Sequence, residues 1–159
     1  MKRFFAAILA LSFLALLLVS CSKELDPTLT IREFCVSYGV EATVYSSRAS
    51  EGNSGYADAN FLPNLLGSEA EGIRDFAVAL QTSLDGNFEV GIFLCKTVYD
   101  ARAVSLACLE RIELVRVLCE STDKPISDGA FVAIYGTAVV YSITDDNDLS
   151  RRLFDALLS

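Results

Sequence analysis

The stretch "IRDFAVALQTSLDGNFEVGIFLCK", residues 73–96, decides the fold. It holds two runs, 73–81 and 88–96, that are rich in the branched and aromatic apolar residues typical of β-strands. The six residues between the runs include Asp85-Gly86, a pair that favours a hairpin turn. The stretch therefore predicts two antiparallel neighbouring strands.

Strand patterns also occur on both sides of this hairpin. Apolar residues alternate with other residues from Phe34 to Tyr45, which predicts a half-buried strand with Gly39 at a bulge or tight turn inside it. Residues 130–144, "AFVAIYGTAVVYSIT", predict a second hairpin that turns near Tyr135-Gly136. The sequence thus indicates about five strands.

Three segments have the period of helices. Residues 97–121 predict a long helix whose inner stripe is Ala101, Val104, Cys108, Ile112, Val115 and Cys119. Residues 145–158 predict a closing helix with Leu149, Leu153, Ala156 and Leu157 on one side. A shorter helix is expected around 58–66, inside the long 46–68 loop, with Gly67 ending it.

The order of these elements predicts the fold class. Hairpins with interspersed helices favour an α+β fold, here an antiparallel sheet of about five strands with two main helices packed on one face. The alternation of strands and helices that builds a doubly wound nucleotide-binding sheet is missing from the sequence.

The N-terminus has the layout of a secretory signal. Lys2 and Arg3 precede an apolar run, Phe4 to Val19, that only Ser12 interrupts. As a helix this run would be about 24 Å long. Since the hydrocarbon core of a bilayer is about 30 Å thick, the run favours a signal over a permanent membrane span.

The end of the run, Leu18-Val19-Ser20-Cys21, resembles the bacterial lipoprotein signal, in which an aliphatic residue at minus three and a small residue at minus one precede a cysteine. The resemblance implies that Cys21 carries a diacylglyceryl thioether and begins the mature chain. An ordinary cleaved signal is the alternative. The predicted organisation is a signal peptide over 1–20, a lipidated cysteine and tether over 21–29, and one globular domain over 30–159. Asp26-Pro27 is expected to discourage helix in the tether.

The remaining chain carries a second resemblance. The order of "GY", "LLG", "DFAVAL", "EVGIFLC", "DARAV", "CLERI" and a late "YGTAVVY" is similar to a group of small lipoproteins of unknown function from clostridium-like Gram-positive bacteria. The similarity covers about residues 34–143 and implies a location at the membrane, with no activity or functional residue attached.

Charge and cysteine content exclude some functions. Without the two cations of the signal, 11 basic and 21 acidic residues give the mature chain a net charge of −10, which disfavours nucleic-acid binding. Histidine and CxxC pairs are absent from the sequence, so no metal or other cofactor is expected. Whether the cysteines form disulfides or are small buried apolar residues stays open. These cysteines are Cys35, Cys95, Cys108 and Cys119.

Enzymatic activity is not expected, because without histidine a catalytic site would have to rest on carboxylates. A glycosidase-like pair would come from Glu51, Glu69, Glu71, Asp75 and Glu89, but their spacing does not require one. The acidic residues 144–150 favour a helix start capped by Thr144 or Asp145 over a calcium loop. Residues 50–56, "SEGNSGY", favour a flexible turn over a phosphate cradle.

These observations predict a membrane-anchored lipoprotein on the extracytoplasmic side, acting as a binding or protein-interaction module of the cell envelope. Its expected partners are the membrane, through Cys21, and an envelope protein; its expected contact surface is the 46–68 loop with the neighbouring sheet edge. Four tyrosines could add aromatic contacts or close the core: Tyr45, Tyr56, Tyr99 and Tyr135. A carboxylate-dependent hydrolase of envelope polymers and a purely structural envelope component are the alternatives.

Overall fold

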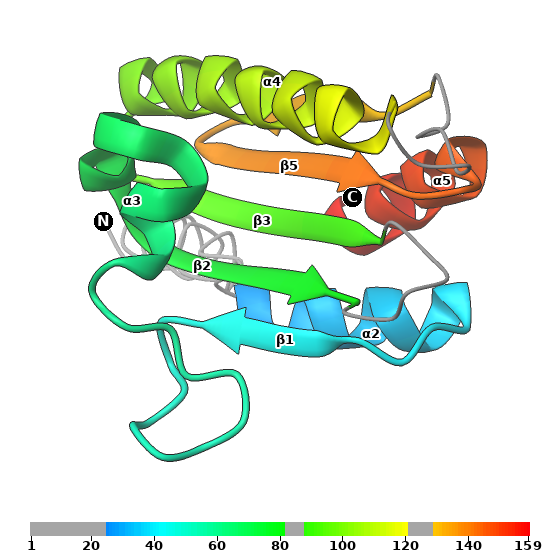
Figure 1. The fold of residues 1–159 in the computed structure, drawn as a ribbon, viewed down its shortest axis with the longest axis horizontal. Helices are drawn as coiled ribbons and strands as arrows, with labels where there is room; N and C mark the ends of the chain where they lie inside the picture. Colours follow the sequence, from blue (N-terminus) through cyan, green and yellow to red (C-terminus); the bar gives the residue numbers. More distant parts are fainter. Residues whose placement is uncertain (1–24, 82–87, 121–128) are drawn as a thin grey trace, which may run out of the picture.

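The computed structural model describes residues 25–81, 88–120 and 129–159. Within them a five-stranded antiparallel sheet has the strand order β1-β2-β3-β5-β4, which confirms the α+β class and the sheet (Figure 1). The strands are β1 (Thr43–Ser46), β2 (Ile73–Leu80), β3 (Glu89–Cys95), β4 (Phe131–Tyr135) and β5 (Ala138–Ile143). The α-helices are α2 (Pro27–Tyr38), α3 (Phe61–Leu66), α4 (Val98–Glu120) and α5 (Asn147–Leu158), and a 3-10 helix, η1 (Gly67–Gly72), follows α3.

Both predicted hairpin pairings are confirmed. In the first, β2 and β3 pair from Ile73 opposite Cys95 to Leu80 opposite Glu89. The expected Asp85-Gly86 turn lies outside the described residues. In the second, β4 and β5 pair beside the turn at Gly136, whose φ of +64° suits a residue without a side chain.

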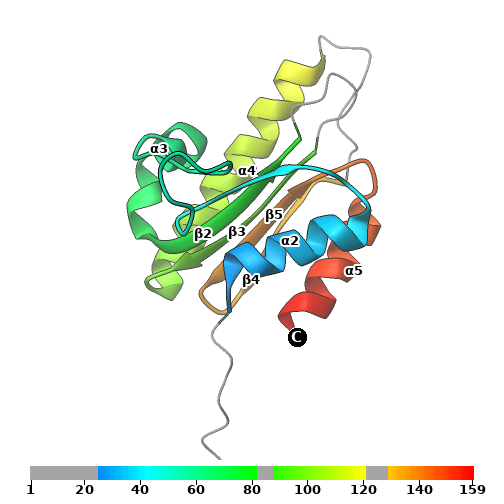
Figure 2. The same ribbon diagram turned by 90° about the horizontal axis from the view of Figure 1, so that it is seen from below.

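The helices cover both faces of the sheet, which corrects the expectation that the two main helices share one face. α2 and α5 lie on one face, and α3 and α4 lie on the other (Figure 2). Every residue of β3 and β5 is therefore buried. One core cluster contains Phe34, Ile92 and Phe154, and the other contains Phe93 and Tyr141.

The predicted strand from Phe34 to Tyr45 is wrong over most of its length, because the chain is helical as far as Tyr38. Asp26 caps α2, since its Oδ1 accepts hydrogen bonds from the backbone N–H groups of Thr28 (2.9 Å) and Leu29 (3.1 Å). Pro27 is the first helical residue, where its missing N–H costs nothing. Residues 27–29, expected in the tether, form the first turn instead.

Gly39 ends α2 in the left-handed region, at φ +82°, and its N–H bonds to backbone oxygens of the last turn. Of the expected strand only residues 43–45 have the strand conformation, and β1 continues one residue further, to Ser46. The expected tight turn at Gly39 is thus a helix cap.

The other helices agree more closely with the predictions made from the sequence. α3 confirms the short helix inside the 46–68 loop, and Gly67 follows its last residue. On α4, the predicted inner residues Ala101, Val104, Cys108 and Ile112 are buried against the sheet. The prediction of a long helix with this inner face is therefore confirmed for the described side chains.

The start of α5 is a cap, as expected of residues 144–150, but the capping residue differs. Asp146 accepts a hydrogen bond from the N–H of Leu149 at 2.9 Å, whereas Thr144 and Asp145 were expected in this role. The buried face also differs, because Ser150 and Phe154 are fully buried. The expected Leu153 and Leu157 are partly buried at its border.

Candidate functional site

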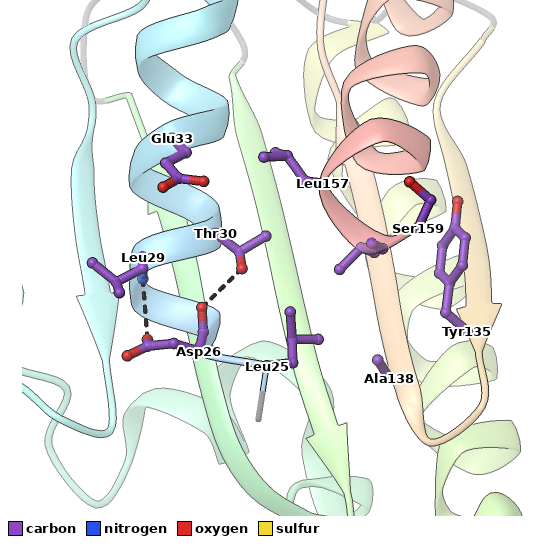
Figure 3. A pocket seen from close by; sticks show the side chains of 10 residues that line it. Leu25, Asp26, Leu29, Thr30, Glu33, Tyr135, Ala138, Leu157 and Ser159 are labelled. Carbon is purple, nitrogen blue, oxygen red and sulfur yellow. Dashed lines mark hydrogen bonds between the residues drawn. The ribbon is translucent and has the colours of Figure 1, made fainter. Parts of the chain in front are cut away.

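A groove opens between the start of α2 and the end of α5, beside the turn that joins β4 and β5 (Figure 3). Its volume is about 360 Å³. The side chains of Thr30 and Leu157 point into the space between the two helices. The groove is lined by Leu25, Asp26, Leu29, Thr30, Glu33, Tyr135, Ala138, Leu157, Leu158 and Ser159.

The lining combines an apolar wall with acidic groups. Four leucines and the ring of Tyr135 supply apolar surface, and Asp26 and Glu33 supply carboxylates on the α2 side. The Tyr135 hydroxyl donates to Oδ1 of Asp155. Burial, and to a smaller extent the neighbouring Asp155 carboxylate, raises the pKa of Tyr135 to about 12. This hydroxyl therefore stays a neutral donor. Such a lining suits an apolar group that lies next to a positive charge.

The two helices that form the groove are also joined at their other ends. The hydroxyl of Tyr38, the last residue of α2, donates to Oδ1 of Asp145 and accepts from the N–H of Asp146 at 3.0 Å. Phe34 of α2 stacks on Phe154 of α5 with ring centroids 4.5 Å apart. These contacts fix the spacing of α2 and α5, so the groove is held open by packing.

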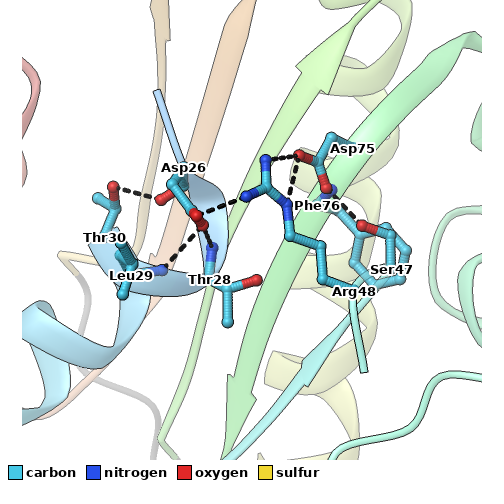
Figure 4. Close-up of polar contacts among 8 residues, drawn as sticks. All are labelled: Asp26, Thr28, Leu29, Thr30, Ser47, Arg48, Asp75 and Phe76. Carbon is cyan, nitrogen blue, oxygen red and sulfur yellow. Dashed lines mark hydrogen bonds and ion pairs between the residues drawn. The ribbon is translucent and has the colours of Figure 1, made fainter. Parts of the chain in front are cut away.

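Arg48 links the groove to the long loop (Figure 4). Its Nη1 pairs with Oδ2 of Asp26, and its Nη2 and Nε lie 2.7 and 3.2 Å from Oδ2 of Asp75 in β2. Oδ1 of Asp75 accepts hydrogen bonds from the Ser47 hydroxyl and from the N–H of Phe76. The start of the loop is thereby tied to both the helix cap and the sheet.

The first half of the loop returns to the edge of the sheet. The N–H of Ser46 donates to the carbonyl of Gly55 at 3.1 Å, and Ser46 forms a bridge with Tyr56. β1 is an edge strand, so the loop and the sheet edge that were expected to form one contact surface do lie together. Residues 50–54 project from this edge and are exposed.

A second polar cluster is buried inside the domain. Arg111 of α4 binds Glu89 of β3 with two parallel hydrogen bonds, from Nε to Oε1 at 2.9 Å and from Nη2 to Oε2 at 2.8 Å. The hydroxyl of Tyr141 also donates to Oε1 of Glu89, at 2.8 Å. Burial raises the pKa of Tyr141 well above its ordinary value, and the negative charge of Glu89 adds a smaller increase. Both carboxylate oxygens of Glu89 are thus engaged within the fold.

The structure does not gather the candidate carboxylates. Glu89 lies opposite Leu80 at one end of β2, and Glu71 precedes Ile73 at the other end; these two ends of β2 are about 23 Å apart at 3.3 Å per residue. Glycosidase pairs are separated by less than about 10 Å. Glu51 and Glu69 are exposed, and Asp75 is bound to Arg48. Within residues 25–81, 88–120 and 129–159, no group of three metal-ligating side chains could hold an ion.

The three cysteines whose side chains are described are free and buried. Burial raises the pKa of Cys35 and of Cys95 to about 11 and raises the pKa of Cys108 further. Such thiols are poor nucleophiles at neutral pH. Cys21 and the side chain of Cys119 lie outside the described part of the chain.

The tyrosines divide between core and surface. Tyr45 stacks on Phe61 with centroids 4.9 Å apart, and Tyr135 lines the groove. Tyr56 and Tyr99 are exposed. The groove itself was missed by the sequence reasoning, because the first turn of α2 was assigned to the tether and its second half, from Phe34, to a strand. The Asp26-Pro27 pair, a capping residue followed by a first-turn proline, is the signal that could have revealed this helix.

No helix in the part of the chain that the structure describes is long and apolar enough to cross a membrane. Comparison with protein-family models, curated proteins and solved structures gives no match to this chain.

Proposed function

We propose that the protein is a lipid-anchored, extracytoplasmic binding module of the cell envelope, and that its binding site is the groove between α2 and α5. The position of Leu25 carries this proposal. Leu25 lines the groove and lies four residues after Cys21. Four residues span at most about 14 Å, so a lipid on Cys21 would hold the groove next to the bilayer surface.

The lining and the charge of the chain indicate the class of ligand. Glu33 places a carboxylate beside apolar side chains, whereas the Asp26 carboxylate is paired with Arg48, and the chain from Cys21 onward has a net charge of −10. A positively charged partner is attracted by this field, and its apolar groups can be buried against Leu29 and Leu157. The proposed ligand is therefore a segment of a membrane-associated envelope protein in which a basic residue lies beside an apolar one.

The loop is the second contact surface of the same module. Because Arg48 binds Asp26, the exposed residues 50–54 follow closely after the rim of the groove. A partner that fills the groove would meet the loop at its edge. Membrane attachment through two or three acyl chains keeps such a module at the surface where that partner resides.

Site-specific photo-crosslinking in intact cells tests the binding site. A photoreactive residue replaces Leu29, which lines the groove and is 51% exposed, or Val36, which is two turns further along α2 and is 81% exposed. The proposal predicts one recurrent adduct from position 29, mapping to a basic and apolar segment, and none from position 36. The adduct should be lost in Glu33→Lys. Equal labelling from both positions, or an adduct unaffected by Glu33→Lys, would refute it.

A further inference from the structure

The outer side of α4 is unusually apolar. Of the eleven large apolar side chains that are exposed in the described residues, seven lie on this one helix. Its inner side packs on the sheet, while Tyr99 is 81% exposed and Leu106 and Val117 are each 62% exposed. In Figure 1, α4 lies along the outside of the sheet with its far side turned away from the other elements. Exposed apolar surface concentrated in this way marks an interaction surface.

We propose that this side of α4 packs antiparallel against α4 of a second copy of the chain. The contact stripe is Val98, Arg102, Leu106, Leu109, Glu113 and Val117, whose spacings of three and four residues place them on one face of a helix. The stripe is symmetric about a point between residues 107 and 108. A two-fold axis through this point, perpendicular to the helix, brings the stripe of one copy against the same stripe of the second copy.

Charge complementarity supports the second copy as the occupant. About that axis Leu106 faces Leu109 of the second copy, and Arg102 faces Glu113. The pairing therefore joins apolar to apolar and basic to acidic side chains at both ends of the contact. Glu113 already pairs with Arg116 of its own helix, Nη1 to Oε1 at 2.6 Å, and its side chain remains 62% exposed. Its carboxylate is accessible to a second cation.

α4 is nearly neutral although the whole chain is strongly acidic, which limits the repulsion between two copies at this face. The helix carries three arginines and four acidic residues, whereas the chain from Cys21 onward carries 11 basic and 21 acidic residues. The stripe spans the 20 residues from Val98 to Val117, or about 29 Å of helix. Two such stripes bury on the order of 600 Å² per partner, the size of a weak association. This face of α4 lies on the opposite side of the sheet from the groove, so self-association here does not depend on the proposed function.

Charge reversal tests the contact in the full mature chain, purified in detergent and examined by sedimentation equilibrium. Arg102→Glu places two acidic residues opposite each other, and Glu113→Arg places two basic ones. Each variant should raise the dimer dissociation constant by at least about tenfold. Arg32→Glu, the same charge change on an exposed α2 residue across the sheet, should leave the constant unchanged.

Mixing the two variants separates a lost contact from a lost fold. An Arg102→Glu chain and a Glu113→Arg chain restore opposite charges across the axis, so the mixture should form heterodimers with nearly the affinity of the unchanged chain. A misfolded variant would not be rescued in this way. A monomeric unchanged chain at about 100 μM, equal effects of Arg32→Glu and Arg102→Glu, or a mixture that stays monomeric would each overturn the proposal.

Discussion

The guanidinium of Arg48 binds the carboxylate of Asp26, so the long loop after β1 is tied to the residue that caps α2. Asp26 also lines the groove. Asp26 therefore connects the cap of α2, the rim of the groove and the loop. A change at Arg48 should increase the mobility of the loop more than it lowers the stability of the core.

Replacing Arg48 with alanine should loosen the loop. Amide hydrogen exchange across residues 47–60 should become at least about tenfold faster. The free energy of unfolding should fall by no more than about 1 kcal/mol, because the Arg48 side chain is 47% exposed and its ion pairs are screened by solvent. Arg48→Lys keeps the charge but not the planar fork that reaches both carboxylates, and should give an intermediate rate. Unchanged exchange in Arg48→Ala would contradict the role of this residue.

Two glycines of the same loop form a matched pair. Gly52 and Gly55 both have positive φ, +85° and +83°. A Cβ at Gly52 meets nothing within 4 Å, whereas one at Gly55 would lie 2.0 Å from the carbonyl oxygen of Val44. Gly52→Ala should cost about 1 kcal/mol from backbone strain alone. Gly55→Ala should cost about 3 kcal/mol, because β1 must also shift. Urea denaturation measures both, and equal costs would show that the loop does not press on β1.

The buried cluster around Glu89 should be important for stability. Glu89→Ala leaves the Arg111 guanidinium without its partner and should cost about 3 kcal/mol. Tyr141→Phe removes one hydrogen bond and should cost about 1 kcal/mol. The double change Glu89→Leu with Arg111→Met should be less destabilising than Glu89→Ala, since no charge is then left buried. Three similar values in urea denaturation would mean that the ion pair is not the origin of the effect.

Stability should fall at alkaline pH. Burial raises the pKa of Cys35 and Cys95 from 9.0 to about 11, and of Tyr135 from 10.0 to about 12. Between these values the folded chain keeps protons that the unfolded chain releases, so rising pH favours the unfolded chain. The stabilisation should be complete below about pH 9 and lost progressively up to about pH 12. Urea midpoints at several pH values measure this loss of stability. Tyr135→Phe should make the loss smaller above pH 10. A urea midpoint that stays constant from pH 9 to pH 12 would contradict the prediction.

Strands β2 to β5 and the longest helix could be predicted because their patterns are local. The β2–β3 hairpin shows two apolar runs around a turn signal, and α4 shows an unbroken helical stripe. α2 was misread because Phe34, Val36 and Tyr38 alternate by coincidence, although only Phe34 of the three is fully buried. The buried set Ile31, Phe34 and Cys35 has helical spacing.

The placement of the helices depends on contacts between distant segments. The continuous apolar runs of β2 and β3 indicate strands covered on both faces. This signal shows that a second layer exists, but not which helix supplies it. The groove needs α2, α5 and the β4–β5 turn together, and the Glu89 cluster joins residues 22 and 52 positions apart in the chain. No local pattern encodes either arrangement.

The most direct test of the proposed anchor is mass spectrometry of the intact protein extracted from cell membranes. The mature chain should begin at Cys21 and carry the added mass of a diacylglyceryl group, and metabolic palmitate labelling should be lost in Cys21→Ala. A secreted chain that begins at another residue, or one that keeps an unmodified Cys21 thiol, would contradict it.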